Sequence, residues 1–144
     1  MTAKEYLSRI RNMDDAVRRE EDELARLEAE LASIRAVDYS RERVQTSGDP
    51  EAAFIAAIDR ILELQADRMR DRERLITVRS EVIMRLEDMD NAAYSELLYL
   101  RYVGGETLES AASIMGYSYD RVRHMHGEAL EEFAKKYEKI LENM

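Results

Sequence analysis

The chain has no cysteine and no tryptophan, and only one proline and five glycines among its 144 residues. Without cysteine it can form neither disulfides nor thiolate metal sites. Proline and glycine interrupt regular structure, so their scarcity, with 37% charged residues, favours long helices and disfavours a β-rich fold. No run approaches the roughly 18 apolar residues of a membrane span, and the start lacks the apolar core of a signal peptide. We therefore expect an all-α, cytoplasmic protein that does not bind membranes.

Positive charge is also in short supply, because 31 acidic residues face 22 basic ones and the formal net charge is -9. Non-specific affinity for nucleic acid depends on Lys and Arg neutralising phosphates. Any DNA binding must therefore be confined to one face of the protein, with help from dimerisation or from a partner.

Residues 2–37 carry apolar side chains in a seven-residue repeat, which is typical of a coiled-coil seam. The two seam positions hold Ala3, Ile10, Val17, Leu24 and Leu31, and Tyr6, Met13, Glu20, Leu27 and Ile34. Glu20 interrupts the apolar series. It either fixes the register of the pairing, as buried polar residues sometimes do, or marks a point where the helices are locally apart.

The polar segment 38–50 predicts a connector that ends at a helix start, with Asp49 as cap and Pro50 in the first turn. Arg41, Arg43 and Gln45 in this connector are interpreted as solvated, with contact to DNA or a partner as the alternative. A second long helix follows to about residue 87. Its broad apolar stripe comprises Phe54, Ile58, Ile61, Leu62, Met69, Leu75, Ile76, Val82, Ile83 and Leu86.

Two long helices joined by a short connector predict a long antiparallel, coiled-coil-like hairpin over residues 1–89. One hairpin leaves part of so wide a stripe uncovered, so we expect oligomerisation into a homodimer through a four-helix bundle. A monomeric hairpin resting on the rest of the chain is the alternative.

Residues 90–144 predict a helix-turn-helix domain. We expect a helix over 91–103, a turn at Gly104 and Gly105, a helix over 108–115 and a last helix from residue 119 to about 142. Thr107 can cap the middle helix, Gly116 suits the left-handed turn that follows it, and Ser118 can cap the last helix.

The last helix separates into two faces at 100° per residue. Its packing face is predicted to hold Val122, Met125, His126, Ala129 and Phe133. The opposite face holds Asp120, Arg123 and His124, flanked by Tyr119 and Arg121. In a helix-turn-helix the N-terminal part of the second helix meets base edges in the major groove.

Arg pairs with guanine, Asp accepts from cytosine, and His donates to guanine or phosphate. We therefore expect Asp120, Arg123 and His124 to contact bases, and Thr107 and Ser118 to contact phosphates. For Arg123 and His124 the alternative is a solvated helix face, and for Asp120 it is a first-turn residue that complements the helix dipole. Tyr119 either stacks or reaches a phosphate, or it covers the turn beside Tyr117.

The stretch "LLYLRYVGGETLESAASIMGYSYDRVRHMHGEALEEF", residues 97–133, resembles the fourth conserved region of bacterial sigma factors. The shared features are the helix over 97–102, Thr107-Leu108-Glu109, Ala111-Ala112, Gly116, Ser118, Val122, Arg123 and Ala129-Leu130. This resemblance implies that Tyr119, Asp120, Arg123 and His124 contact DNA. The other sigma-factor regions are absent, so the chain is not expected to be a complete sigma factor.

The stretches "AKEYLSRIRNMD", "SRERVQTSGDPEAAFIAAIDRILEL", "LRYVGG", "MGYS" and "MHGEAL" resemble small prophage proteins of Gram-positive bacteria. These are related to the RinA-like and ArpU-like late transcription regulators. The resemblance implies a phage transcription regulator that binds double-stranded DNA and acts with host RNA polymerase. The last helix continues with "EALEEF", which is acidic where many such proteins are basic.

No catalytic motif, phosphate-binding glycine loop or carboxylate–histidine metal spacing occurs, so we expect a non-enzyme without cofactor or metal. His124 and His126 are two residues apart and do not share a helical face. Two alternatives to the regulator are a DNA-packaging adaptor of the small-terminase type and a protein-interaction module whose helix-turn-helix does not bind DNA. Glu128, Glu131 and Glu132 support the last alternative.

Overall fold

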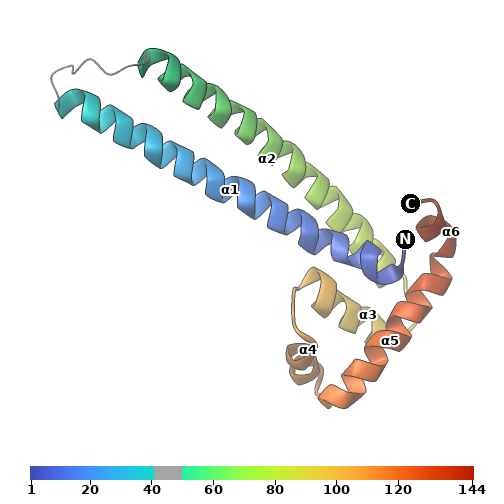
Figure 1. Ribbon diagram of the computed structural model, residues 1–144. Helices are drawn as coiled ribbons and strands as arrows, with labels where there is room; N and C mark the ends of the chain where they lie inside the picture. Colours follow the sequence, from blue (N-terminus) through green and yellow to red (C-terminus); the bar gives the residue numbers. More distant parts are fainter. Residues whose placement is uncertain (41–49) are drawn as a thin grey trace. The chain divides into compact units, whose positions relative to one another are not determined.

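The computed structural model describes residues 1–40 and 50–144, and every regular element in those ranges is a helix (Figure 1). The elements are α1 (Ala3–Ser40), α2 (Pro50–Glu87), α3 (Ala92–Leu98), a π-helical turn η1 (Tyr99–Val103), α4 (Leu108–Met115), α5 (Tyr119–Lys136) and α6 (Glu138–Glu142). The predicted all-α class is therefore confirmed. Within the described ranges, no helix combines the length and apolarity needed to cross a membrane. The predictions for Arg41, Arg43, Gln45 and Asp49 fall outside the described residues.

The first turn of α1 is held by a reciprocal pair of hydrogen bonds. The Thr2 hydroxyl accepts from the Glu5 backbone N–H at 3.1 Å, and the Glu5 carboxylate accepts from the Thr2 N–H at 2.8 Å. These bonds satisfy two N–H groups that the helix itself cannot pair, and they lower the pKa of Glu5. At the second long helix, the start at Pro50 and the end at Glu87 agree with the sequence prediction.

The helices divide into two compact units, of which one comprises Asp15–Glu73. Its core joins Leu24 of α1 to Ile61 and Leu64 of α2, with Leu27 and Leu31 packed at the side. Ion pairs of 3.8 Å also link the two helices, from Glu21 to Arg72 and from Glu23 to Arg60.

The predicted apolar stripe of α2 was wrong in one respect. Leu62, Met69 and Ile76 are 57%, 66% and 64% exposed, whereas Leu64, absent from the predicted stripe, is buried. The exposed residues therefore lie on a different side of α2 from Leu64. The apolar positions in a sequence do not show which side of a helix is covered by the neighbouring helix.

Glu20 is partly buried and faces acidic side chains of α2. Its Oε2 atom is buried with no hydrogen-bond partner among the described residues, as is Nε of Arg68. Burial, with the neighbouring carboxylates of Asp71 and Asp67, raises the pKa of Glu20 from 4.5 to about 7. The interpretation that the helices are apart at Glu20 does not agree with this burial.

The other unit comprises Met1–Asp14 and Arg74–Met144. Its main core contains Ala3, Tyr6, Leu7, Ile10, Val78, Val82, Leu86, Met89, Leu98, Tyr102, Ala129, Phe133 and Leu141. Phe133 is fully buried in this core, with its ring 5.8 Å from that of Tyr6 and 4.7 Å from that of Tyr137. The two units thus group residues differently from the predicted segments 1–89 and 90–144, because the first turns of α1 pack against α5.

Two helix boundaries differ from the predictions. The predicted single helix over 119–142 breaks at Tyr137, whose φ is -112°. Tyr137 donates its hydroxyl to the Arg85 carbonyl at 2.7 Å, and this tertiary contact has no signature in the local sequence. The predicted helix over 91–103 begins with Asn91 as cap and widens into η1 in its last turn.

Candidate nucleic-acid interface

Helices α4 and α5 are joined by a turn whose geometry agrees with its sequence. Thr107 caps α4 by accepting from the Ser110 N–H at 3.1 Å, and Ser118 caps α5 by accepting from the Arg121 N–H at 3.2 Å. Between them Gly116 has φ 74° and ψ 28°, in the left-handed region that favours glycine. The predicted caps and turn are thus confirmed. Both hydroxyl hydrogens remain able to donate to an incoming acceptor.

The inner face of α5 fixes the orientation of its outer face. Val122 and Met125 pack with Ala111, Ala112 and Leu97 in a second core. Further along α5, residues 129 and 133 are fully buried in the main core. The predicted packing face is therefore confirmed, and the opposite side of α5 is solvent-exposed.

Asp120, Arg123 and His124 lie together on that exposed side, and we call them the recognition face. Their side chains are 75%, 58% and 66% exposed. Arg123 Nη2 donates to Asp120 Oδ1 at 2.9 Å, which restricts the guanidinium to one side of the helix. The three side chains that the sequence placed on one face are thus adjacent in the structure.

His124 has a defined tautomer in this arrangement. Its Nδ1 lies 2.8 Å from the Asp120 backbone carbonyl, which can only accept, so Nδ1 carries the hydrogen. In the neutral ring Nε2 is then a hydrogen-bond acceptor, and in the charged ring both nitrogens donate. Neutral His124 therefore offers an acceptor through Nε2, whereas the charged ring offers the donor that the sequence predicts.

Arg121 and Tyr119 flank the recognition face. The Arg121 guanidinium lies over the Tyr117 ring, 4.1 Å from its centroid, which is cation–π geometry. This contact was not predicted from the sequence, although a Tyr-x-x-x-Arg spacing across a helix cap could have suggested it. Tyr119 is 47% exposed, so its ring does not fill the core beneath the turn.

His126 has a structural role, as interpreted from its place on the packing side. Its Nε2 lies 2.8 Å from the Tyr102 hydroxyl, and the two rings stack at 5.8 Å. Burial and the positive charges of Arg101 and Lys4 lower the pKa of His126. The neutral ring is thus favoured inside the unit.

The formal charge of residues 107–127 is zero, because Arg121 and Arg123 balance Glu109 and Asp120 when both histidines are neutral. This segment therefore lacks the excess of acidic residues found in the rest of the chain. A phosphate backbone would meet less repulsion here than elsewhere, although two arginines supply little non-specific attraction.

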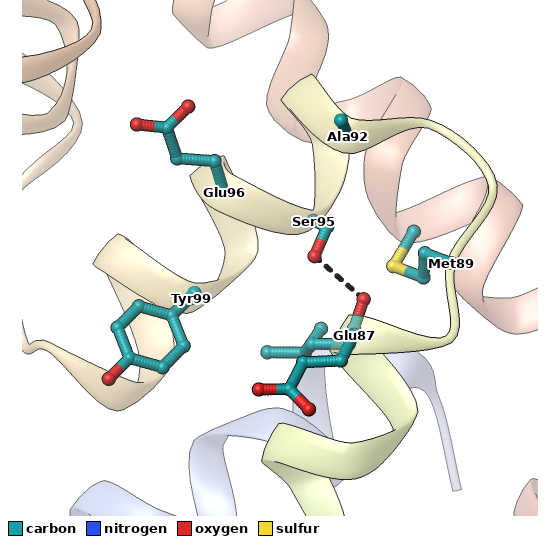
Figure 2. Close-up of a pocket in the computed structure, with 7 residues that line it drawn as sticks. Glu87, Met89, Ala92, Ser95, Glu96 and Tyr99 are labelled. Carbon is teal, nitrogen blue, oxygen red and sulfur yellow. Dashed lines mark hydrogen bonds between the residues drawn. The ribbon is translucent and has the colours of Figure 1, made fainter.

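A shallow groove of about 440 Å³ lies where α2 meets α3 (Figure 2). Leu86, Met89 and Ala92 line it, and Glu87 and Glu96 give it an acidic rim. The Ser95 hydroxyl donates to the Leu86 carbonyl at 2.7 Å and joins the two helices there. No sequence motif indicated this groove.

Comparison with known proteins identifies no relative of this chain. No protein-family model, no curated protein and no solved structure matches the chain.

Proposed function

We propose that the chain is a sequence-specific DNA-binding regulator of phage transcription. In this proposal α4 and α5 form a helix-turn-helix like sigma region four, and α1 and α2 form an antiparallel hairpin through which the protein dimerises. The observation that carries the proposal is the exposed recognition face at the start of a helix that is capped by Ser118 and preceded by Gly116 in the left-handed conformation. The sigma-like resemblance adds host RNA polymerase as a candidate partner.

The first turns of α5 would enter the major groove of a duplex, as the second helix of such a motif does. Arg123, held by Asp120, would donate two hydrogen bonds to guanine O6 and N7. Neutral His124 would accept through Nε2 from the amino group of adenine or cytosine. Ser118 and Thr107 would donate to phosphates, and Arg121 and Tyr119 would approach the backbone beside them.

The test is selection from a random pool of roughly 30-base-pair duplexes, followed by mobility shift with the enriched sequence at several salt concentrations. We expect one enriched sequence, and loss of preference for it in the double variant Arg123→Ala with His124→Ala. Arg26→Ala is the matched control, because it removes the same formal charge from an exposed position on α1 and should leave binding unchanged. Failure of any sequence to be enriched at low salt would contradict the proposal.

Arg121→Ala separates backbone contact from base contact. Loss of one phosphate contact reduces the slope of log affinity against log salt by about 0.9 and leaves sequence preference intact. Loss of Arg123, by contrast, should relax preference at one base pair at a cost of about 1–3 kcal/mol.

A second candidate function is binding of a protein partner through the groove in Figure 2. Its apolar floor beside Glu87 and Glu96 suits an apolar side chain with a cationic neighbour. Ala92→Glu would disrupt such binding from an exposed position that lines the groove, whereas the DNA-binding proposal predicts that Ala92→Glu leaves the enriched duplex bound.

A further inference from the structure

The side of α2 that faces away from α1 carries a second apolar series. Ile55, Leu62 and Met69 follow one another at seven-residue intervals and are 52%, 57% and 66% exposed. Ile61 and Leu64 lie on the other side of the helix, where they contact α1. Within Asp15–Glu73, α2 therefore has one apolar face with a partner and one without. We call Ile55, Leu62 and Met69 the outer seam.

Single exposed apolar residues are ordinary on protein surfaces, but a regular series is not. Seven residues amount to 700° of helical rotation, so successive members drift by only about 20° and remain on one face. This repeat is the pattern by which helices pair in coiled coils. Ala66 lies on the same face between Leu62 and Met69, and its small side chain permits close approach of another helix.

Two opposite charges beside the outer seam are placed symmetrically about one point of α2. Glu63 and Arg70 border the seam on the same side and are 69% and 58% exposed. They lie at equal distances from the midpoint between Ala66 and Asp67. When a second copy of α2 packs antiparallel about a two-fold axis at that midpoint, Glu63 of each copy meets Arg70 of the other. The same operation interleaves the Leu62 and Met69 side chains.

We infer that the outer seam is the interface for a second copy of this chain, paired antiparallel about a two-fold axis near Ala66. A patch that supplies both charges of an ion pair symmetrically about one point is self-complementary, as a two-fold interface requires. The present partners of these charges are Arg60, 3.5 Å from Glu63, and Asp67, which bonds Arg70. Both are exposed ion pairs between residues of one helix, and such pairs are weak enough for Glu63 and Arg70 to change partners on dimerisation.

Cysteine crosslinking tests the geometry directly, because the natural chain contains no cysteine. Ala66→Cys places two thiols beside the two-fold axis, so oxidation should link the copies. Ala52→Cys is the matched control, since Ala52 occupies the same heptad position two repeats earlier and would lie about 40 Å from its counterpart. Linkage at both positions would indicate parallel pairing and overturn the inference. Linkage at neither position would also overturn it.

Charge reversal followed by sedimentation tests the ion pairs. Arg70→Glu should weaken dimerisation at least tenfold, and the double variant Glu63→Arg with Arg70→Glu should restore it to within about threefold. Leu62→Glu should give a monomer with unchanged helical circular dichroism. A native chain that is monomeric at 100 µM, or a double variant as weak as the single one, would overturn the inference.

This inference rests on the self-association in the proposed function but not on DNA. If the protein is monomeric and still selects a DNA sequence, the inferred interface is overturned and the DNA-binding proposal is not. If a crosslinked dimer selects no sequence, only the DNA-binding proposal is contradicted.

Discussion

Replacement of Glu20 by glutamine should stabilise the protein at alkaline pH and have little effect at acid pH. The folded protein raises the pKa of this carboxyl from 4.5 to about 7, through burial and the carboxylates of Asp71 and Asp67. The folded state therefore binds the Glu20 proton more tightly than the unfolded state does. The resulting stability is complete below pH 4.5 and is lost as the pH rises to about 7.

The magnitude follows from the same pKa. One pKa unit corresponds to about 1.4 kcal/mol, so the full difference amounts to about 3.5 kcal/mol at most. The side chain is only partly buried, and solvent screening reduces the expected effect to about 1–2 kcal/mol. Glutamine keeps the shape of glutamate but cannot ionise, so it avoids this loss at high pH.

Urea denaturation followed by circular dichroism at pH 5 and pH 8 measures the effect. Glu20→Gln should exceed the native chain by about 1–2 kcal/mol in free energy of unfolding at pH 8 and by about a quarter of that at pH 5, where the unfolded carboxyl is already partly ionised. Glu28→Gln, an exposed change of equal charge on the same helix, controls for net charge. His126 is present in both proteins, so any effect of its protonation cancels in the difference. An equal gain at both pH values would show that folding does not raise the pKa of Glu20.

The turn before α5 and the core behind it give further tests. Gly116→Ala should cost about 1–2 kcal/mol because φ is +74°, whereas Gly127→Ala, with nothing within 4 Å of the added Cβ, should gain about 0.5–1 kcal/mol within its helix. Thermal unfolding compares the two, and the opposite order would contradict the left-handed turn. Phe133→Ala should cost about 3–5 kcal/mol because the ring is fully buried. Tyr137→Phe should cost about 0.5–1.5 kcal/mol through its lost bond to Arg85, and no change in urea midpoint would contradict that bond.

The features that could be predicted from the sequence depend on a few neighbouring residues. A capping hydroxyl binds an N–H three residues away, and a left-handed turn needs one glycine, so Thr107, Ser118 and Gly116 could be identified without a structure. The recognition face also followed from helical spacing alone, because the buried residues of α5 determine which side is exposed.

The features that could not be predicted depend on contacts between distant parts of the chain. The break at Tyr137 accompanies its hydrogen bond to Arg85, 52 residues away. The pairing of Tyr6 with Phe133 brings the first turns of α1 into the C-terminal core, against any division of the chain by sequence order. The two sides of α2 were combined into one stripe because Ile61 and Leu62 are equally apolar, and only packing separates them.

Titration of the selected duplex into isotope-labelled protein, followed by NMR, shows directly which helix contacts the DNA. The largest chemical-shift changes should fall between Thr107 and His124, with the His124 ring signals among them. Changes confined to the groove near Met89 or to the outer seam of α2, with α5 unaffected, would contradict the proposed DNA contact through α5.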